Sequence, residues 1–393
     1  MRLLVLTSSF PSAPDDPSGH FVQASALELG RSAEVHVVSA GRRFGSVPER
    51  RGPLWVHWAG GGNLFGWPGA AARLRQAPWR VVGAGSFGLG VRRHLRELGP
   101  FDAAVAHWIV PCAWPLLAHT HFPLEAFAHG ADVRLLCGLP SPLRAAVVRS
   151  LLARGARVRF AADSLRQRLL ASLPCALAGR LEQASTVTPP ALALPDVAEL
   201  RAEAAALRRS VGLDPAAPDA AGLVVSAGRL VEGKRLDLAL DSMALLEPPA
   251  RFVVVGDGPE RRSLEQRCRT LGLGASFLGR LPRPRTLAWL AAADVLLHTS
   301  EREAAPTVVR EARALGTPVV CCPAGDLMAW AALDQGMVVS RPDPVSLAAA
   351  LGRQLGTPLP PAAWSEIRRA NRPTSDPGLR PRPLLGHARG LHR

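Results

Sequence analysis

The chain has 393 residues, 47 of them Lys or Arg against 32 Asp or Glu, and 48% of its residues are apolar. Because this length exceeds one ordinary hydrophobic core, we expect two domains. An apolar half with 20% charged residues excludes global disorder, and the composition also excludes collagen-like and coiled-coil proteins.

The six cysteines show neither C-x-x-C spacing nor a zinc pattern, which predicts a reducing compartment and no bound metal. The apolar run at 1–6 is too short for a signal peptide and is expected to form a buried strand. The longest apolar stretch, 103–118, is interrupted by Pro111 and Pro115 and falls short of the roughly 20 residues of a membrane span. We therefore expect a cytoplasmic protein without a transmembrane helix.

In the first half, short β-rich runs alternate with stretches rich in Ala, Leu and Arg, a pattern typical of βαβ units. The expected strands are 3–7, 34–39, 55–58, 102–107 and 126–128, with helices at 21–29 and 142–154.

The second half repeats this alternation with a more regular period and predicts a doubly wound parallel sheet. The expected strands are 223–227, 251–255, 276–278, 295–298 and 319–321, and the helices are 236–246, 260–271, 285–292 and 307–316.

Three prolines soon after a strand expected at 185–188 predict a boundary between a first domain at 1–195 and a second at 196–371. The first domain carries 21 basic and 11 acidic residues, a net charge of +10, whereas the second carries 21 and 20, a net charge of +1. Residues 372–393, with five Arg and one Asp, are expected to form a disordered basic tail.

Two weaker patterns suggest other chemistry. Residues 83–88 match G-x-G-x-x-G, which would indicate a dinucleotide and a nicotinamide oxidoreductase, but no acidic residue follows at the required distance. A flexible loop or a helix start is the alternative. His119, His121 and His129 with Asp132 match no metal-site spacing, so no metal is assigned to them.

Two cations follow a buried strand in the second half. Arg229 and Lys234, the chain's only lysine, stand in the segment G-R-L-V-E-G-K directly after the strand expected at 223–227. They should project from its carboxyl end, where α/β sheets bind ligands. Two cations at that edge suit a diphosphate.

Two carboxylates stand eight positions apart across a second strand-to-helix turn. Glu303 precedes the helix and Glu311 lies inside it, with Pro306 suited to the first helical position. The amides around Thr307 and Val308 would form an anion site at the helix N-terminus. Carboxylates readily accept hydrogen bonds from sugar and ribose hydroxyls; a solvated Glu pair on a surface helix is the alternative.

These motifs resemble the donor domain of the family-four, group 1 glycosyltransferases of the GT-B fold, and the first half resembles the same family more weakly. The chain is therefore expected to be an α/β protein with two Rossmann-like doubly wound domains facing across a cleft. The segments that carry the resemblance are 228–234, 253–258, 277–279 and 300–320 in the second half, and 1–22, 101–111 and 127–133 in the first.

The resemblance implies a nucleotide-sugar donor domain at 196–371. Arg229 and Lys234 would bind the leaving diphosphate. Glu303 would bind hydroxyls of the donor sugar, and Glu311 would bind the ribose. The enzyme would be a retaining glycosyltransferase that needs no cofactor beyond the nucleotide sugar.

The first domain would hold the acceptor, a glycan or a lipid-linked molecule. From this domain His129 would face the donor sugar and the loop at Gly19 would approach the diphosphate. Four departures from the family pattern keep open a non-catalytic or partner-dependent GT-B sugar-binding subunit. They are Ala304 for a Gly, Pro189–Ala191 for an Asn-Gly turn, His20 for a second Gly, and 326–328 where a further Gly would be common.

The first domain also combines its net charge with Arg and aromatic residues, which predicts binding to an anionic membrane surface at the cytoplasmic face, whereas no nucleic-acid partner is expected. The alternative is that Trp55 and Trp58 are core residues of a strand. The segment interleaves Arg42, Arg43, Arg50 and Arg51 with Phe44, Trp55, Trp58, Phe65, Trp67 and Trp79.

Overall fold

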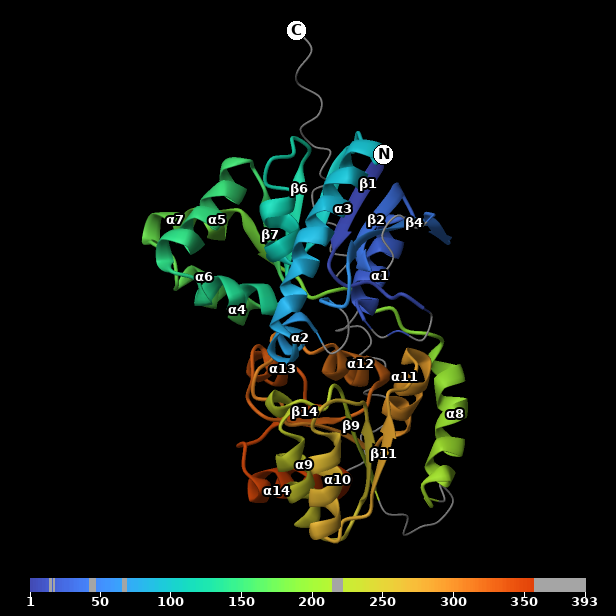
Figure 1. Cartoon of the computed structure of the whole chain (residues 1–393). Helices are drawn as coiled ribbons and strands as arrows, with labels where there is room; N and C mark the ends of the chain where they lie inside the picture. The colour runs from blue at the N-terminus through green and yellow to red at the C-terminus, as the bar shows by residue number, and fades with distance from the viewer. Residues whose placement is uncertain (14–15, 17, 42–46, 66–68, 214–221, 357–393) are drawn as a thin grey trace. The chain divides into compact units, whose positions relative to one another are not determined.

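A computed structural model describes residues 1–13, 16, 18–41, 47–65, 69–213 and 222–356. The chain separates into two compact units, the first from Met1 to Ala191 and the second beginning at Leu192 (Figure 1). The tail expected at 372–393 lies outside the described residues.

The first unit is built on an eight-stranded sheet of order β3-β4-β2-β1-β5-β6-β7-β8, in which only the edge strand β3 runs antiparallel to its neighbour among the pairings described. Its strands are β1 (Arg2–Thr7), β2 (Glu34–Gly41), β3 (Glu49–Arg51), β4 (Leu54–Gly61), β5 (Ala103–His107), β6 (Leu124–Ala128), β7 (Arg157–Phe160) and β8 (Ser185–Val187).

Helices connect these strands in the order that βαβ units require. They are α1 (His20–Leu29), α2 (Ala70–Gln76), η1 (Pro78–Val81), α3 (Val82–Leu98), η2 (Ile109–Leu116), α4 (Ala131–Gly138), α5 (Ser141–Ala153), α6 (Asp163–Leu170) and α7 (Cys175–Gln183).

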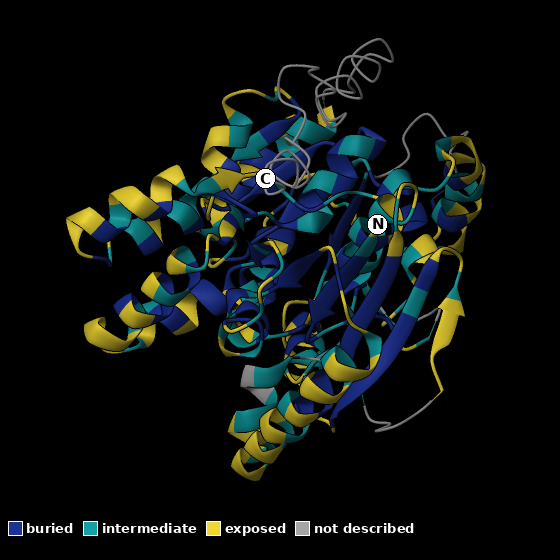
Figure 2. Cartoon of the chain, turned by 90° about the horizontal axis from the view of Figure 1, so that it is seen from above, coloured by how far each residue is buried: buried dark blue, intermediate teal, exposed yellow. Residues whose placement is uncertain are grey.

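The central strands of this sheet are nearly continuous apolar runs. Strand β5 is buried at every position and β1 at every position after Arg2. Such runs are expected where helices cover both faces of a parallel sheet. Figure 2 shows the strands buried and the outer faces of the helices exposed. The strands expected in the first half of the sequence are confirmed, and β3 and β7 are additional strands that the sequence pattern did not predict.

The glycines of the G-x-G-x-x-G pattern lie inside helix α3 and not in a strand-to-helix turn, so the dinucleotide interpretation of this segment is wrong. The helix lies against β4. A Cβ on Gly83 would stand 2.5 Å from the carbonyl oxygen of Gly61, and one on Gly90 would stand 2.0 Å from that of Ala59. Gly83 of the pattern and Gly90, further along the helix, therefore serve close packing of α3 on β4, whereas a Cβ on Gly85 would meet nothing within 4 Å.

The second unit contains a six-stranded parallel sheet of order β11-β10-β9-β12-β13-β14, which confirms the doubly wound sheet. Its strands are β9 (Leu223–Ala227), β10 (Arg251–Val255), β11 (Ala275–Gly279), β12 (Val295–His298), β13 (Val319–Cys321) and β14 (Met337–Val339). Its helices are α8 (Val197–Ser210), η3 (Glu232–Lys234), α9 (Leu236–Ala244), α10 (Arg261–Thr270), α11 (Arg283–Ala292), α12 (Thr307–Leu315), α13 (Leu327–Ala331) and α14 (Pro344–Gly356).

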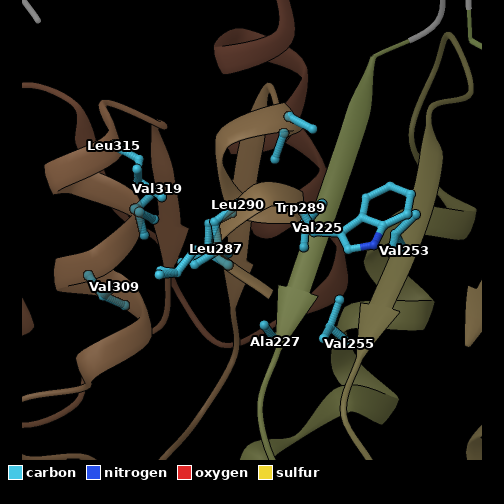
Figure 3. Close-up of a cluster of buried hydrophobic side chains, with 14 of the residues drawn as sticks. Val225, Ala227, Val253, Val255, Leu287, Trp289, Leu290, Val309, Leu315 and Val319 are labelled. Carbon is cyan, nitrogen blue, oxygen red and sulfur yellow. The ribbon is translucent and has the colours of Figure 1, made fainter. Parts of the chain in front are cut away.

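Helix α11 fills part of the core of this unit. Its Trp289 belongs to the same buried cluster as Val225 of β9 and Val253 of β10 (Figure 3). Helix α12 begins at Thr307, as expected, with Pro306 as its N-cap and not as its first helical residue. It ends at Leu315, and the following Gly316, with a φ of 81°, forms a left-handed C-cap. The core thus fixes the ends of the strands on which the candidate site stands.

The residues proposed for membrane binding have different surroundings. Trp58 is buried in β4, where its Nε1 donates a hydrogen bond of 2.8 Å to Glu49, so it belongs to the core. Trp79 is 72% exposed. Residues 42–44 and Trp67 lie outside the described residues. Within the ranges that the structure covers, no helix is both long and apolar enough to cross a membrane.

We expect Gly90→Ala to lower the stability of the first unit and Gly85→Ala to raise it. Both residues lie in α3, but a Cβ on Gly85 meets nothing within 4 Å. Overpacking typically costs about 1–3 kcal/mol, whereas an unobstructed Gly-to-Ala change in a helix contributes about 0.5–1 kcal/mol. Urea unfolding followed by circular dichroism measures both. Equal midpoints for the two variants would contradict the packing role of Gly90.

Candidate functional site

The second unit places its polar residues where β9 and β12 lie side by side. After β9 the chain continues to β10 on one side, and after β12 it continues to β13 on the other. Open α/β sheets bind ligands at such a switch point, beyond the carboxyl ends of the strands. The loop after β9 carries Lys234, and the loop after β12 carries Glu303.

Lys234 and Glu303 form an ion pair across this switch point. The Lys234 ammonium donates a hydrogen bond to Oε1 of Glu303, and Nε2 of His298 lies 3.4 Å from the same oxygen. The two loops are also joined by backbone groups. Thr299 Oγ1 donates to the carbonyl of Lys234 at 2.9 Å, and the Glu301 amide donates to the carbonyl of Gly233 at 3.2 Å. Hydrogen bonds between the two loops therefore fix the positions of both members of the ion pair.

The charges at this pair are set by burial and by the partners. Burial alone would raise the pKa of Glu303, but the charge of Lys234 and the nearby imidazole of His298 together hold that pKa well below its usual range. Burial lowers the pKa of His298, partly offset by Glu303. At pH 7 Glu303 is thus a carboxylate beside a neutral imidazole.

Two glycines of the V-V-V-G-D-G segment bring the loops of the site together. A Cβ on Gly256 would stand 1.8 Å from the carbonyl oxygen of Gly228, and one on Gly258 would stand 2.2 Å from that of Leu230. A small hollow opens at this edge with the exposed Arg229 on its rim. It is lined by Ser226, Ala227, Gly228, Arg229, Leu230, Lys234, Leu236, Val254, His298, Thr299 and Ser300.

Glu311 has a cationic partner of its own, which the sequence did not predict. It is 6% exposed on α12, and Arg283 at the start of α11 donates a hydrogen bond of 2.6 Å to its Oε1. Thr307 and Val308 form the first turn of α12, as expected, and are partly buried. The two carboxylates of the predicted site therefore stand in separate ion pairs.

Ala304 occupies an ordinary backbone conformation. Among the residues that the structure describes, the only non-glycine residues with positive φ are Trp108 and Arg235. Ala304 is buried, and a Cβ on the neighbouring Gly325 would lie 3.0 Å from its Cα, so close packing at this turn is served by Gly325. The exchange of Gly for Ala at 304 therefore introduces no φ strain.

The first unit has a switch point of its own between β1 and β5. Gly19, in the loop after β1, has a φ of 67° and caps α1, and a Cβ on it would stand 2.2 Å from the carbonyl oxygen of Ser9. Trp108, directly after β5, has a φ of 72°. Glycine adopts a positive φ without strain, but a non-glycine residue such as Trp108 does not, and strained residues of this kind cluster at functional sites.

His129 follows β6 at the same edge and is surrounded by rings. Its Nε2 lies 2.9 Å from Nδ1 of His107, and the two imidazole planes are nearly parallel, at 8°, with their centroids 5.1 Å apart. The rings of Phe21, Trp108 and Phe127 have their centroids 4.9, 5.0 and 4.3 Å from that of His129. The imidazole is thus held in a box of aromatic side chains.

Asp132 fixes the backbone around His129. Its buried carboxylate accepts hydrogen bonds from the amides of Ile109 at 2.7 Å, His129 at 3.2 Å, Gly130 at 2.9 Å and Val133 at 3.0 Å. Its oxygens are committed to the protein. No group of three or more potential metal ligands occurs in the described part of the chain.

Four residues of these sites escaped the sequence reasoning as functional candidates, namely His107, Trp108, Arg283 and His298. His107, Trp108 and His298 stand in or next to segments that carried the family resemblance, at the end of a strand, which is the signal that could have found them. Arg283 lacks such a signal, and Asp132 was considered only as a metal ligand.

Residues 214–369 match a family model described as "Glycosyl transferases group 1". The 2-deoxystreptamine glucosyltransferase of Streptomyces kanamyceticus is 32% identical over 227 residues, which is 56% of this chain and 56% of that protein. The chain thus spans little more than half the length of this curated relative.

Solved structures resemble the whole chain. Sucrose-phosphate synthase from Thermosynechococcus elongatus superposes with a TM-score of 0.69 at 18% identity, covering 94% of this chain and 93% of that one. Anabaena HepE, solved in complex with UDP-glucose, superposes with a TM-score of 0.61 at 19% identity, covering 94% of both chains. These likenesses confirm the expected GT-B fold with two Rossmann-like domains.

We expect the first unit to lose stability as the pH falls below about 6.5. Burial, and then the charge of Arg159, lowers the pKa of His107 to about 3. The folded chain therefore keeps this imidazole neutral while the unfolded chain protonates it, so each pH unit below about 6.5 costs ~1.4 kcal/mol per such histidine. In urea unfolding between pH 6.5 and 5, His107→Asn should flatten the slope, whereas His119→Asn, at an exposed position, should not. Parallel slopes for wild type and His107→Asn would refute this.

Proposed function

We propose that this chain moves a sugar from a nucleotide diphosphate sugar to an acceptor, because residues 214–369 match the family model of the group 1 glycosyl transferases. The observation that carries the proposal is the Lys234–Glu303 ion pair at the switch point of the second unit. A fold shared with HepE, which was solved with UDP-glucose, supports the choice of donor class.

The pair suits the departure of a diphosphate. An ammonium has three N–H donors, of which one meets Glu303, so the others are available to phosphate oxygens. Negative charge grows on the leaving diphosphate during transfer, and preorganised cations stabilise that charge. Arg229 on the rim of the hollow adds a second cation. The ionised Glu303 can in turn accept hydrogen bonds from sugar hydroxyls.

The start of α12 supplies the remaining contacts of the proposal. The amides of Thr307 and Val308 belong to the first turn of the helix, where N–H groups lack intrahelical partners and favour an anion. Glu311, whose charge Arg283 balances, would bind the ribose hydroxyls. Arg283 has several N–H donors, so it can hold the Glu311 carboxylate in place while that carboxylate also accepts a hydrogen bond from a hydroxyl.

The finer parts of the proposal follow the family resemblance. Transfer would retain the anomeric configuration and would need no metal. The first unit would hold a glycan or lipid-linked acceptor, with His129 facing the donor sugar and the loop at Gly19 facing the diphosphate. Proton NMR of the product's anomeric signal tests retention directly, since inversion gives the opposite coupling pattern.

We further propose that the first unit binds the cytoplasmic face of an anionic membrane. The support comes from helix α3, whose inner face packs on β4 and whose outer face carries exposed apolar residues followed by arginines. Arginine near anionic lipid contributes about 1 kcal/mol each, and Trp favours the headgroup region. The exposed residues are Trp79, Val82, Leu89, Arg92, Arg93 and Arg96.

We expect Lys234→Ala to reduce transfer at least about a hundredfold, or ~3 kcal/mol, because removing one preorganised donor has that effect. Lys234→Arg should also be impaired, since a planar fork does not replace a compact ammonium. Initial rates are measured with the nucleotide sugar that gives the largest thermal shift. Activity within threefold of wild type would overturn the assignment, and absence of both transfer and donor hydrolysis in the wild type would favour the sugar-binding subunit.

A matched double variant separates catalysis from folding. Lys234→Ala also leaves the carboxylate of Glu303 buried and unpaired, which lowers stability. Lys234→Met combined with Glu303→Gln removes both charges at similar volume, so it should regain stability and remain inactive.

Glu311→Ala should weaken nucleotide binding, whereas Glu303→Ala should lower turnover more than affinity. A ribose contact is equal in the ground and transition states, but a contact with the reacting sugar strengthens as charge develops. Calorimetry with the nucleoside diphosphate and steady-state kinetics separate the two. Unchanged nucleotide affinity in Glu311→Ala would remove its ribose role.

The membrane proposal predicts sedimentation with anionic vesicles at low salt and little with neutral ones. Replacing Arg92, Arg93 and Arg96 by Glu should abolish it. Arg180→Glu on α7, an exposed position of the same unit, is the control and should bind as wild type does. Equal sedimentation of anionic and neutral vesicles would refute an electrostatic membrane site.

A further inference from the structure

The histidine pair in the first unit has only one hydrogen-bonding arrangement that leaves no buried donor unpaired. Nδ1 of His107 lies 2.9 Å from Nε2 of His129, so one ring must donate and the other accept. His107 is fully buried, and in the described part of the chain its Nε2 has no hydrogen-bond partner. A buried N–H without a partner is rarer and costlier than an unpaired acceptor. The proton of His107 therefore belongs on Nδ1.

We propose that His107 is a positioning residue that donates from Nδ1 to Nε2 of His129 and thereby holds His129 as its Nδ1–H tautomer. The outward nitrogen of His129 is then a hydrogen-bond donor. This inference rests on the proposed function in one respect, that the nitrogen meets an oxygen of the donor sugar. It specifies the ligand group that His129 can bind, because the sugar must present an acceptor oxygen to this nitrogen.

The surroundings of the pair support a fixed neutral tautomer. The aromatic box of Phe21, Trp108 and Phe127 restricts rotation of the His129 ring. Burial lowers the pKa of both imidazoles, and the charge of Arg159 adds to this in each case. With both rings neutral at pH 7, each imidazole carries one N–H. The N–H of His107 occupies the lone pair on Nε2 of His129, so the N–H of His129 lies on its other nitrogen, Nδ1.

The backbone is locked as firmly as the ring. Asp132 accepts hydrogen bonds from the amides of His129 and Gly130 in the β6–α4 turn and from that of Ile109 after β5. The turn that carries His129 and the segment that follows His107 are thereby joined through one carboxylate. Orientation of the ring and position of its Cα are thus set by different residues.

Long-range proton–nitrogen NMR of the full chain labelled on histidine nitrogens reads the tautomer without activity. The signal of His129 is assigned by its loss in His129→Gln. At pH 7 we expect Nδ1 of His129 to be protonated and Nε2 unprotonated. A protonated Nε2, or an exchanging mixture of tautomers, would overturn the proposal whatever the enzyme does.

Variants at His107 test the consequence for binding. Asn at 107 places an N–H near the position of Nδ1, so His107→Asn should keep the tautomer and stay within about threefold of wild-type kcat/KM. His107→Leu removes the donor, so it should yield mixed tautomers and about a tenfold loss, the size of one hydrogen bond. His57→Leu, at another buried histidine of the unit, should change stability but not the tautomer.

The outcomes separate the two claims. The expected tautomer together with an equal kcat/KM for the Leu and Asn variants would overturn the positioning role. Absence of any transfer by wild type, with the expected tautomer present, would count against the proposed function and uphold the hydrogen-bonding arrangement. Loss of the tautomer in His107→Asn would show that His107 does not act through its donor.

Discussion

The ion pair between Lys234 and Glu303 is the interaction on which the second unit's site depends. Two opposite charges that are largely withdrawn from water are stable only when each satisfies the other and further hydrogen bonds hold the geometry. Here the backbone amide of Glu301, in the loop after β12, donates a hydrogen bond to the carbonyl of Gly233, in the loop after β9. His298 lies beside the Glu303 oxygen that accepts from Lys234. The paired side chains thus have no net charge, while Lys234 keeps N–H donors and Glu303 keeps acceptor lone pairs for a ligand.

Close approach of backbone segments is the second constraint, and it explains most of the informative glycines. Gly256 and Gly258 let the loops after β9 and β10 touch, which places Arg229 and Lys234 at one edge. Gly90 likewise allows close approach of backbones, here of helix α3 and strand β4, where no ligand-binding residue has been assigned. A glycine pattern alone therefore does not distinguish a phosphate loop from a packing surface.

The sequence therefore predicts some features of the structure and not others. Buried parallel strands are continuous apolar runs, so their positions and the residues at their carboxyl ends, Lys234 and Glu303 included, could be predicted. Which side chains meet could not, because pairing depends on strand order and rotamers. Arg283 lies 28 positions before Glu311 in another helix. The segment at 83–88 matched a dinucleotide motif by spacing alone, and the structure places it in the first turns of helix α3, in agreement with the alternative of a helix start.

Both units place polar side chains at the switch point of a sheet, but the chemistry of those side chains differs. In the second, charged groups converge on a switch point, which suits a ligand that carries formal negative charge. In the first, the corresponding edge holds neutral imidazoles, aromatic rings and a carboxylate consumed by backbone amides. A neutral donor in an apolar box contributes a direction and no net charge, so it discriminates by the position of an oxygen. The edge of the second unit therefore suits a charged ligand group, and the edge of the first unit suits an uncharged group that offers an acceptor oxygen.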